Sequence, residues 1–309
     1  MIHLGVDASK AELVAMDEER LQKVPNQKRK IQAFLASFPN PGSLAVESTG
    51  GYETELAKAA HEAGWIVYVL QPAWVKAFAR MQGSRAKTDA VDARLIRDFL
   101  IARKDSLRPW TPPEERIEKL QSIFRQRQRL ADDIARMRTR YRALGMEKTM
   151  LKALLAGPLN ARKVLDTQLE QLLKDDPIAQ RLLAVPGVGP QTTAAVVCTL
   201  GKGTFLKAES FVAFAGLDPS AYESGQSKGQ RRISKKGDQS LRRALFMAAM
   251  NGSKLPTWKP RIQAMKERGM APTKAIVALA RKIATVLFHI ANNNVQFDPT
   301  KVQLKTKEA

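Results

Sequence analysis

The chain has almost none of the residues from which disulfides and thiolate metal sites are built. Its 309 residues include one cysteine, Cys198, and three histidines, His3, His61 and His289. A single cysteine excludes an internal disulfide and a thiolate zinc cluster, and the histidines are too scattered to indicate a ligand set. Any metal site must therefore be built from carboxylates.

Long uninterrupted apolar runs are also missing. The longest apolar stretch, residues 275–290, is broken by Arg281 and Lys282, so we expect no membrane-spanning helix. Residues 2–6 indicate a strand and lack the basic start and long apolar centre of a secretory signal. We therefore expect a cytoplasmic protein with no membrane partner.

Acidic residues are scarce relative to basic ones. The chain has 51 Lys and Arg against 30 Asp and Glu, a formal charge of +21, and only 6% aromatic residues. Such an excess is more than solubility requires and favours a polyanionic partner, with nucleic acid as the leading candidate. Its 44% hydrophobic content is enough to bury a sizeable core, and the length indicates two or three domains.

The first hundred residues have the pattern of an α/β domain. Short apolar runs at residues 2–6, 12–16, 43–46 and 65–70 predict strands. Helical patterns cover residues 27–38 and 52–63, follow Pro72, and run from residue 89 toward residue 101. A sheet with covering helices is the economical fold for this alternation.

Three prolines, Pro109, Pro112 and Pro113, then mark a boundary or hinge before a different pattern begins. Apolar residues between 117 and 144 recur at alternating spacings of three and four, which predicts a long helix with a coiled-coil-like seam. The seam residues are Leu120, Ile123, Leu130, Ile134, Met137, Tyr141 and Leu144. We expect a cationic exposed face on the same helix, from Arg125, Arg127, Arg129, Arg136, Arg138, Arg140 and Arg142.

The rest of the chain, from about residue 182, is predicted to be mainly helical with glycine-rich interruptions. Residues 183–193 predict two helices joined by a tight turn containing Gly187 and Gly189, a helix-hairpin-helix that can offer backbone N–H groups to phosphate. A simple helical corner is the alternative. The last helix is expected to start at Pro272, and residues 301–309 to fray.

Four acids have the placement of a metal site. Asp7 and Glu47 each follow a predicted strand, and Asp89 and Asp92 lie three apart at the start of a helix, where their Cβ atoms would be roughly 5–6 Å apart on one face. Carboxylates of this kind can hold Mg²⁺ for phosphoryl transfer. Acids in a first helical turn, capped by Thr88, are also an ordinary structural feature, so only the ensemble is informative.

A glycine-rich basic segment follows residue 221. It contains Ser224, but no nearby histidine could act as its general base, so a serine-hydrolase arrangement is unsupported. From spacing alone, a solvated basic loop that contacts phosphate is the better interpretation.

Taken together, these motifs resemble a known family. Gly5-Val6-Asp7-Ala8-Ser9-Lys10, Glu47-Ser48-Thr49-Gly50-Gly51-Tyr52 and Lys87-Thr88-Asp89-Ala90-Val91-Asp92-Ala93 resemble the DEDD transposases of bacterial insertion sequences, which are relatives of the Piv invertases. The second half is similar to the same family in Pro186-Gly187-Val188-Gly189, in Phe214-Ala215-Gly216-Leu217-Asp218-Pro219 and in Ser224-Gly225.

The resemblance implies a fold of three domains and a composite site. A RuvC-like, RNase H-type domain (residues 1–108) would bind Mg²⁺ or Mn²⁺ through Asp7, Glu47, Asp89 and Asp92. A helical coiled-coil domain (109–178) would precede a C-terminal transposase domain (179–300), whose Ser224 would be the nucleophile that forms a covalent phosphoserine. Residues 301–309 would form a flexible tail.

The resemblance also implies the partners. Family members similar to this chain are recombinases guided by a structured non-coding bridge RNA, which pairs with donor and target DNA, and they act as homo-tetramers, dimers of dimers, in bacterial cytoplasm at the nucleoid. The expected nucleic-acid contacts are Arg85, Lys87, Arg125, Arg129, Arg136, Arg140, Gly187, Gly189, Lys228, Arg231, Arg232, Lys235, Lys236, Arg242 and Arg243.

Two other functions are compatible with the residues themselves. One is a metal-dependent, structure-specific nuclease similar to a junction resolvase, in which water attacks and Ser224 has no role. The other is a basic nucleic-acid-binding scaffold whose acids are helix caps and solvated surface.

Overall fold

The computed structural model describes residues 2–302 apart from 19, 49, 84–87, 202–204, 206, 221–222, 225–226 and 229–231. Only the backbone is described for Ser220, Glu223, Ser224, Ser227, Lys228 and Arg232. The chain forms two compact units, Met1–Pro113 and Glu114–Ala309. Their boundary falls directly after the last of the three prolines. The further division of the second unit at residue 178 stays a prediction.

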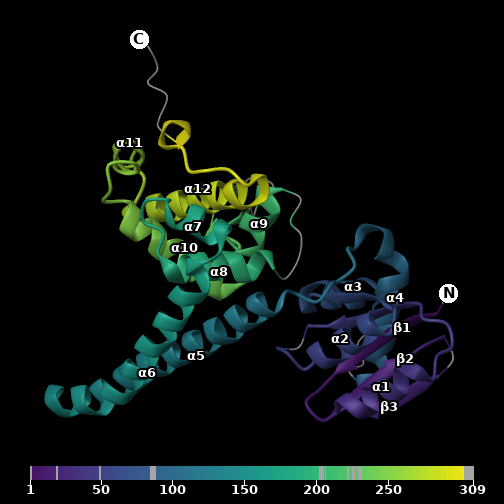
Figure 1. The fold of residues 1–309 in the computed structure, drawn as a ribbon. Coiled ribbons are helices and arrows are strands. Elements are labelled where there is room, and N and C mark those ends of the chain that lie inside the picture. The colour runs from purple at the N-terminus through teal and green to yellow at the C-terminus, as the bar shows by residue number, and fades with distance from the viewer. Residues whose placement is uncertain are drawn as a thin grey trace. The chain divides into compact units, whose positions relative to one another are not determined.

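The first unit is built on a mixed five-stranded sheet. Its strands are β1 (His3–Ala8), β2 (Glu12–Met16), β3 (Leu21–Pro25), β4 (Ser43–Glu47) and β5 (Ile66–Leu70), in the order β3-β2-β1-β4-β5 (Figure 1). The pairs β1–β2 and β2–β3 are antiparallel, whereas β1, β4 and β5 run parallel. The carboxyl ends of β1, β4 and β5 therefore lie at one edge of the sheet.

Helices cover both faces of this sheet, which confirms the α/β prediction. Strand residues alternate between the faces: Leu4, Val6 and Leu44 pack in one core with α1 (Lys28–Ala36) and α2 (Thr54–Glu62). Ala45, Tyr68 and other residues of the opposite face pack with α3 (Pro72–Met81) and α4 (Asp89–Arg103), which leads into the short η1 (Lys104–Ser106). Successive strand residues point to opposite faces, and apolar residues on both faces are buried against helices.

Strand β3 is absent from the sequence-based predictions. Val24 is its one buried residue, while its neighbours are exposed or half-buried, so the apolar alternation that marks an inner strand is lacking. Its backbone pairing with β2, from Glu12–Pro25 to Met16–Leu21, holds it at the edge of the sheet. Such pairing leaves little trace in sequence hydrophobicity.

The second unit begins with an antiparallel pair of long helices, α5 (Glu115–Ala143) and α6 (Lys148–Lys174), which run side by side in Figure 1. The predicted seam is confirmed along most of its length, because Ile134 is buried against Leu151 and Leu155 of α6. Leu144 is the exception: it is 73% exposed, since it lies at the end of α5 beyond the reach of α6.

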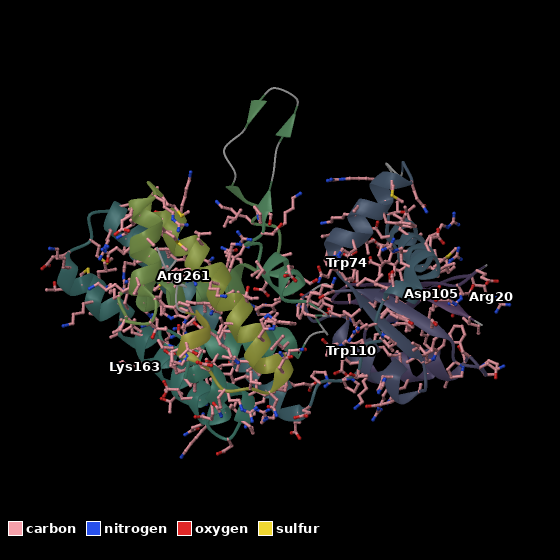
Figure 2. The ribbon with its side chains drawn as sticks, turned by 90° about the horizontal axis from the view of Figure 1, so that it is seen from above. Arg20, Trp74, Asp105, Trp110, Lys163 and Arg261 are labelled. Atoms are coloured by element: carbon pink, nitrogen blue, oxygen red, sulfur yellow. The ribbon has the colours of Figure 1, made fainter. Side chains whose placement is uncertain are left out.

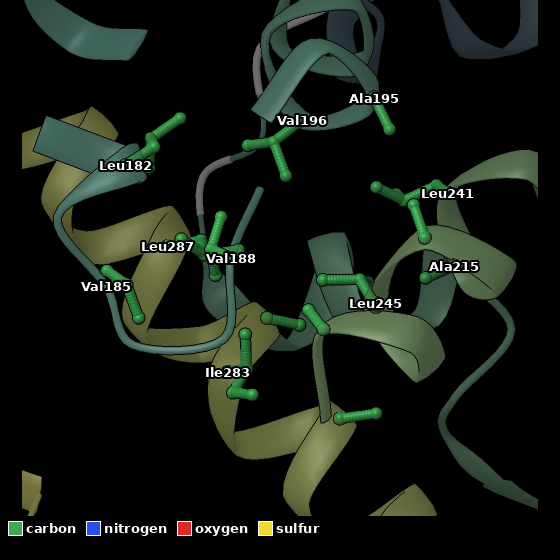
Figure 3. Packing of buried hydrophobic residues seen from close by; sticks show 14 of the residues in the cluster. Leu182, Val185, Val188, Ala195, Val196, Ala215, Leu241, Leu245, Ile283 and Leu287 are labelled. Carbon is green, nitrogen blue, oxygen red and sulfur yellow. The ribbon is translucent and has the colours of Figure 1, made fainter. Parts of the chain in front are cut away.

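The remaining helices pack into one core. They are α7 (Pro177–Leu183), α8 (Pro190–Leu200), α9 (Ala208–Phe214), α10 (Gln239–Gly252), α11 (Lys259–Glu267) and α12 (Pro272–Asn293), followed by η2 (Pro299–Val302). Figure 3 shows Val185 and Val188, from the turn between α7 and α8, packed against Ile283 and Leu287 of α12. The ends of α5 and α6 nearest α7 join the same core through Phe124 and Leu169.

Four short strands interrupt the helices where a glycine-rich segment was predicted. They are β6 (Pro219–Ser220), which pairs with β9 (Arg232–Ile233), and β7 (Glu223–Ser224), which pairs with β8 (Ser227–Lys228). Strands of two residues are too short to produce a recognisable alternation of apolar and polar residues. The prediction of a mainly helical C-terminal half is otherwise confirmed.

Two expectations about the C-terminal part require correction. The length and composition of α12 would allow it to cross a membrane despite Arg281 and Lys282. Leu279 and Ile283 are nevertheless fully buried in the protein core, and a core helix passes the same test of length and composition. Residues 301 and 302 are not frayed: Val302 is buried, and its carbonyl accepts a hydrogen bond from Arg261 Nη2 at 3.0 Å. Residues 303–309 lie outside the described part of the chain.

Candidate active site and nucleic-acid interface

Asp7 and Glu47 end neighbouring parallel strands on the same face of the sheet. The register pairs Val6 of β1 with Val46 of β4, so each acid follows the paired residue by one position. Because Val6 and Val46 are buried against α1 and α2, the acids point to the opposite face, which α3 and α4 cover. Both carboxylates are half-buried there.

Helix α4 lies directly on this face because position 5 has no side chain. A Cβ on Gly5 would meet Ala93 O at 2.3 Å and Arg97 N at 2.4 Å, so the helix backbone is in contact with β1. Ala93 also packs against Val14, the residue that pairs with Asp7 across β1 and β2. The beginning of α4 is thereby held over the carboxyl end of β1.

Asp89 and Asp92 occupy the first turn of α4, as predicted. Thr88 caps the helix, its Oγ1 accepting a hydrogen bond from Val91 N at 3.3 Å, and Asp92 N donates to Thr88 O at 2.9 Å. Asp89 is exposed and Asp92 half-buried. Asp7 and Glu47 are thus placed on one face of the sheet by strand geometry, and Asp89 and Asp92 lie in the first turn of the helix that covers this face.

The donor chemistry of these residues suits a hard divalent cation. All four side chains offer carboxylate oxygens, the ligands that Mg²⁺ and Mn²⁺ prefer. Within the described part of the chain, however, no three His, Cys, Asp or Glu side chains are gathered closely enough to hold an ion. The residues therefore fit a metal by type and by face, and their role as ligands stays a prediction.

Histidine makes no contribution at this edge of the sheet. His3 begins β1, at the strand end opposite to Asp7, and burial lowers the pKa of its imidazole, with the positive charge of Lys104 as the next cause. Its neutral form is favoured in that setting, as expected for a core histidine.

The Ser224 segment has a well-bonded base in the second unit. Ser234 Oγ donates to Asp218 Oδ1, and Ser234 N donates to Asp218 O at 2.9 Å, which joins the two ends of the segment. Lys235 N donates to Gly216 O at 3.1 Å on the same side. Backbone and side-chain bonds therefore close the base, which lies between the end of α9 and the start of α10.

Ser224 itself lies in β7, paired with Ser227 of β8. Figure 2 shows β7 and β8 as two short arrows beyond the paired strands β6 and β9. The serine side chain is outside the described part of the chain, and so is any contact it makes. Its role as nucleophile stays a prediction.

The turn between α7 and α8 has two glycines with different roles. Gly187, at φ +92°, is packed so tightly that a Cβ would lie 2.6 Å from Gly252 Cα of α10, and Trp258 Nε1 donates to Pro186 O at 2.9 Å beside it. Gly189, the N-cap of α8, has open space where a Cβ would be. Gly187 is thus required by packing, and Gly189 alone leaves room for a phosphate.

Some of the cationic side chains predicted to contact nucleic acid are exposed, and others are bonded to groups of the protein itself. Arg125, Arg129, Arg140, Lys235 and Lys236 are exposed, and Arg136 is exposed beside Asp133. Arg243 pairs with Asp132 at 2.8 Å, and half-buried Arg242 donates to Ala215 O at 3.0 Å, so Arg242 supports the base of the Ser224 segment. The side chains of Arg85, Lys87, Lys228, Arg231 and Arg232 lie outside the described part of the chain.

Arg127 is not on the exposed face of α5, contrary to prediction. Its Nε lies 2.9 Å from Asp166 Oδ1 of α6, and Gln191 Nε2 of α8 approaches the same oxygen at 3.4 Å. The signal was present in the sequence, because position 127 lies seven residues after Leu120 and seven before Ile134, on the seam. This network, absent from the predicted sites, joins both long helices to the first turn of α8.

Comparison with known proteins agrees with the order of these motifs. Residues 4–146, which include the four acids, match a family model described as "Transposase", and residues 179–264, which include Ser224, match the "Transposase IS116/IS110/IS902 family". The pilin gene-inverting protein of Moraxella lacunata is 30% identical over 264 residues, which cover 82% of this chain and 81% of that protein. This chain belongs to the IS110 family of transposases.

Further relatives share the same breadth of similarity. The transposase for insertion sequence element IS1328 of Yersinia enterocolitica is 26% identical, over 80% of this chain and 82% of that protein. The probable family 20 transposase of Pseudomonas aeruginosa is 26% identical over 96% and 98% of the two chains. As a member of the IS110 family, the protein is a DNA-acting transposase or recombinase, and the predicted resemblance to DEDD transposases is confirmed.

Proposed function

We propose that this IS110-family transposase is an RNA-guided DNA recombinase that cleaves and rejoins donor and target DNA through a covalent phosphoserine at Ser224. The observation that carries the proposal is the shared face of Asp7 and Glu47 at the carboxyl ends of two parallel strands, with Asp89 and Asp92 in the first turn of the helix that covers this face. Ligands of α/β sheets bind at such edges. The chain-wide likeness to transposases supports DNA as the ligand of this edge.

The first unit supports a RuvC-like, RNase H-type assignment. Its three antiparallel strands continue into two parallel ones, in the order β3-β2-β1-β4-β5, with the first acid on the central strand. Asp7, Glu47, Asp89 and Asp92 would hold Mg²⁺ or Mn²⁺, which supplies Lewis-acid stabilisation of charge on the scissile phosphate. The protein contributes the placement of the four carboxylates.

The proposed reaction conserves phosphodiester bonds. Ser224 Oγ attacks phosphorus, the bond from phosphorus to the 3′ oxygen breaks, and the departing 3′ oxygen takes up a proton as the serine hydroxyl loses one. A 3′-hydroxyl of the exchanged strand then attacks the phosphoserine and releases the serine. Because the bond energy is retained in the protein linkage, joining needs no external energy source.

The proposal also names the RNA, DNA and protein partners of the chain. We assign sequence recognition to a structured bridge RNA, and backbone recognition to exposed cations such as Arg125 and Arg129. The active assembly would be a homo-tetramer in which the carboxylates of one subunit act with Ser224 of another, in the bacterial cytoplasm at the nucleoid. RNA that co-purifies with the protein, sequenced and tested for pairing with two DNA sites, checks this part, and its absence would contradict guidance.

The decisive experiment traps the covalent intermediate. Wild-type protein, Ser224→Ala and the matched control Ser227→Ala from the same hairpin are incubated with the co-purifying RNA, end-labelled donor DNA, target DNA and Mg²⁺, then denatured. We expect a protein–DNA adduct in wild type and in Ser227→Ala, and none in Ser224→Ala. Cleavage that persists in Ser224→Ala without any adduct would instead establish the nuclease alternative.

A second experiment separates catalysis from simple binding. Asp89→Asn removes one charge from an exposed helical position, and the loss of a favourable helix-dipole contact costs at most about 1 kcal/mol. We expect Mg²⁺-dependent cleavage to be lost while DNA affinity and thermal stability are retained. Unchanged cleavage would favour the scaffold interpretation.

The relatives favour inversion as a second candidate function. Two of them carry the name pilin gene-inverting protein, and each is 30% identical over 82% of this chain. A plasmid with two native element ends in inverted orientation, assayed by restriction mapping, distinguishes inversion from insertion into a second plasmid.

A further inference from the structure

Helix α3 has an exposed face of unusual composition. Trp74 is 44% exposed and Met81 82% exposed, seven residues apart and therefore on one stripe of the helix. Lys76 and Arg80 are exposed and four residues apart, on a second stripe. The ten residues of α3 include no acid. With about 3.6 residues per turn, Lys76 and Arg80 lie roughly 120–160° around the helix from Trp74. The apolar stripe and the cationic stripe therefore flank the solvent side of α3, with the exposed Ala73 and Ala77 between them.

The opposite side of α3 accounts for its stability without Trp74. Val75 is buried, and the Phe78 ring packs edge-on against Phe99 of α4, with centroids 5.4 Å apart. Pro72 begins the helix at a position where its missing N–H costs nothing. The core of this face therefore holds α3 in place, and the Trp74 side chain is not required for folding.

Trp74 differs from the other tryptophans of the chain. Trp65 and Trp258 are buried, and Trp110 is half-buried with its backbone N–H bonded to Val67 O at 2.6 Å. Lone exposed apolar side chains are common, but tryptophan is the one best able to stack with a base. Trp74 (labelled in Figure 2) is combined with two cations that have no ion-pair partner among the described residues.

Helix α3 begins close to the edge of the sheet at which Asp7 and Glu47 lie. Strand β5 ends at Leu70, which pairs with Glu47 of β4, and α3 begins two residues later. α3 and α4 cover the sheet face on which Asp7 and Glu47 lie. A strand of DNA whose phosphate reaches this edge would therefore have α3 as its neighbour within the same unit.

We propose that the exposed face of α3 is a binding site for a single strand of DNA, in which Trp74 stacks on an unpaired base and Lys76 and Arg80 contact the flanking phosphates. Unpaired bases arise when cleaved strands are exchanged, so the inference rests on the proposed recombinase function. Stacking on an aromatic side chain is tolerant of base identity because every base has a π-face. The site therefore holds the strand without reading its sequence.

The experiment measures binding without chemistry. All variants are made in the full-length Ser224→Ala protein and assayed in EDTA, so the outcome does not depend on whether Ser224 is the nucleophile. The probes are a fluorescein-labelled DNA strand of about 12 nucleotides, its duplex, and RNA of the same sequence. The variants are Trp74→Ala, Trp74→Phe and Lys76→Gln/Arg80→Gln, with Ile101→Ala as the matched truncation of another apolar side chain, 45% exposed, on α4.

We expect Trp74→Ala to weaken single-strand DNA binding about tenfold and duplex binding less than about twofold. Trp74→Phe, which keeps an aromatic face, should lose at most about threefold. Lys76→Gln/Arg80→Gln should lower the slope of log K against log salt for the single strand by about 1.4. Ile101→Ala should bind like the parent protein, and thermal melts should coincide.

Three results would overturn the proposal. In the first, Trp74→Ala binds single-strand DNA as tightly as Ile101→Ala. In the second, Trp74→Ala loses single-strand and duplex affinity equally, which indicates a general effect on the fold. In the third, only RNA binding falls, which assigns the α3 face to RNA. Quenching of tryptophan fluorescence by the DNA strand, lost in Trp74→Phe, provides an independent signal of stacking.

Discussion

At the scale of single residues, the placement of the carboxylates depends on a position without a side chain. Gly5 allows the α4 backbone to approach β1 so closely that a Cβ would lie 2.3 Å from Ala93 O. Main-chain atoms of a helix cannot move aside as the end of a flexible side chain can. The contact that holds α4 against β1 thus depends on glycine at position 5.

Gly5→Ala should therefore destabilise the first unit strongly. We expect the free energy of unfolding, measured by urea denaturation, to fall by about 3 kcal/mol, since the added methyl group overpacks the contact. Gly157→Ala is the matched control, because a Cβ there has no neighbour within 4 Å and alanine favours the helix α6. It should raise stability by about 0.5–1 kcal/mol, and equal effects of the two substitutions would refute the packing argument.

The Arg127–Asp166 pair gives a second residue-scale prediction. The side chains are 10% and 27% exposed, so Asp166→Ala leaves a guanidinium in a largely buried place and should cost about 3 kcal/mol of stability. Asp133→Ala removes the partner of Arg136 in a pair whose side chains are 54% and 74% exposed, and should change stability by less than about 0.5 kcal/mol. Similar losses in both variants, measured by urea denaturation, would show that burial is not the cause.

At the scale of elements, the periodicity of apolar residues predicted the helices and strands that pack through side chains. It did not predict the strands whose position is set by backbone hydrogen bonds. The seam of α5 was recognisable because Leu120, Ile123 and Ile134 repeat at helical spacing. Strand β3 and the short strands around Ser224 were not, since their register is set by hydrogen bonds between main chains. Arg127 lay on the seam pattern, yet its charge favoured the wrong prediction of exposure.

The seam prediction can be tested along α5. Ile134→Ala should destabilise the α5–α6 pair by about 3 kcal/mol, because its side chain is 3% exposed among Leu151 and Leu155. Leu144→Ala, at 73% exposure, should have an effect within about 0.5 kcal/mol. Hydrogen exchange of the α5 and α6 amides measures both, and an equal loss of protection would contradict the seam as described.

At the scale of the whole molecule, the charge of +21 dominates the encounter with nucleic acid. Binding that neutralises six to ten phosphates loses about 10³–10⁵ in affinity between 50 and 200 mM salt. We expect the protein to lose at least about a thousandfold on a non-specific duplex over this range. Affinity that is flat with salt would contradict a backbone-reading surface.

The contribution of the Ser224 segment to that surface can be isolated. Lys235→Gln/Lys236→Gln removes two exposed cations near its base and should reduce the salt slope by about 1.8, provided that each contacts one phosphate. Lys23→Gln is the control, because Lys23 already pairs with Glu12 at 3.1 Å. An unchanged slope in the double variant would exclude these residues from the interface.

The sequence by itself determined the α/β character of the first unit, the long helix with its seam, the cationic surface, and the identity and order of the four acids and Ser224. These depend on local periodicity, composition and short motifs, which are readable residue by residue. Only the tertiary structure decided that Asp7 and Glu47 share a sheet face covered by α4, that Gly187 packs on α10, and that Arg127 is buried beside Asp166. Those outcomes depend on contacts between segments far apart in the chain, where register and close approach of main chains decide which side chains meet.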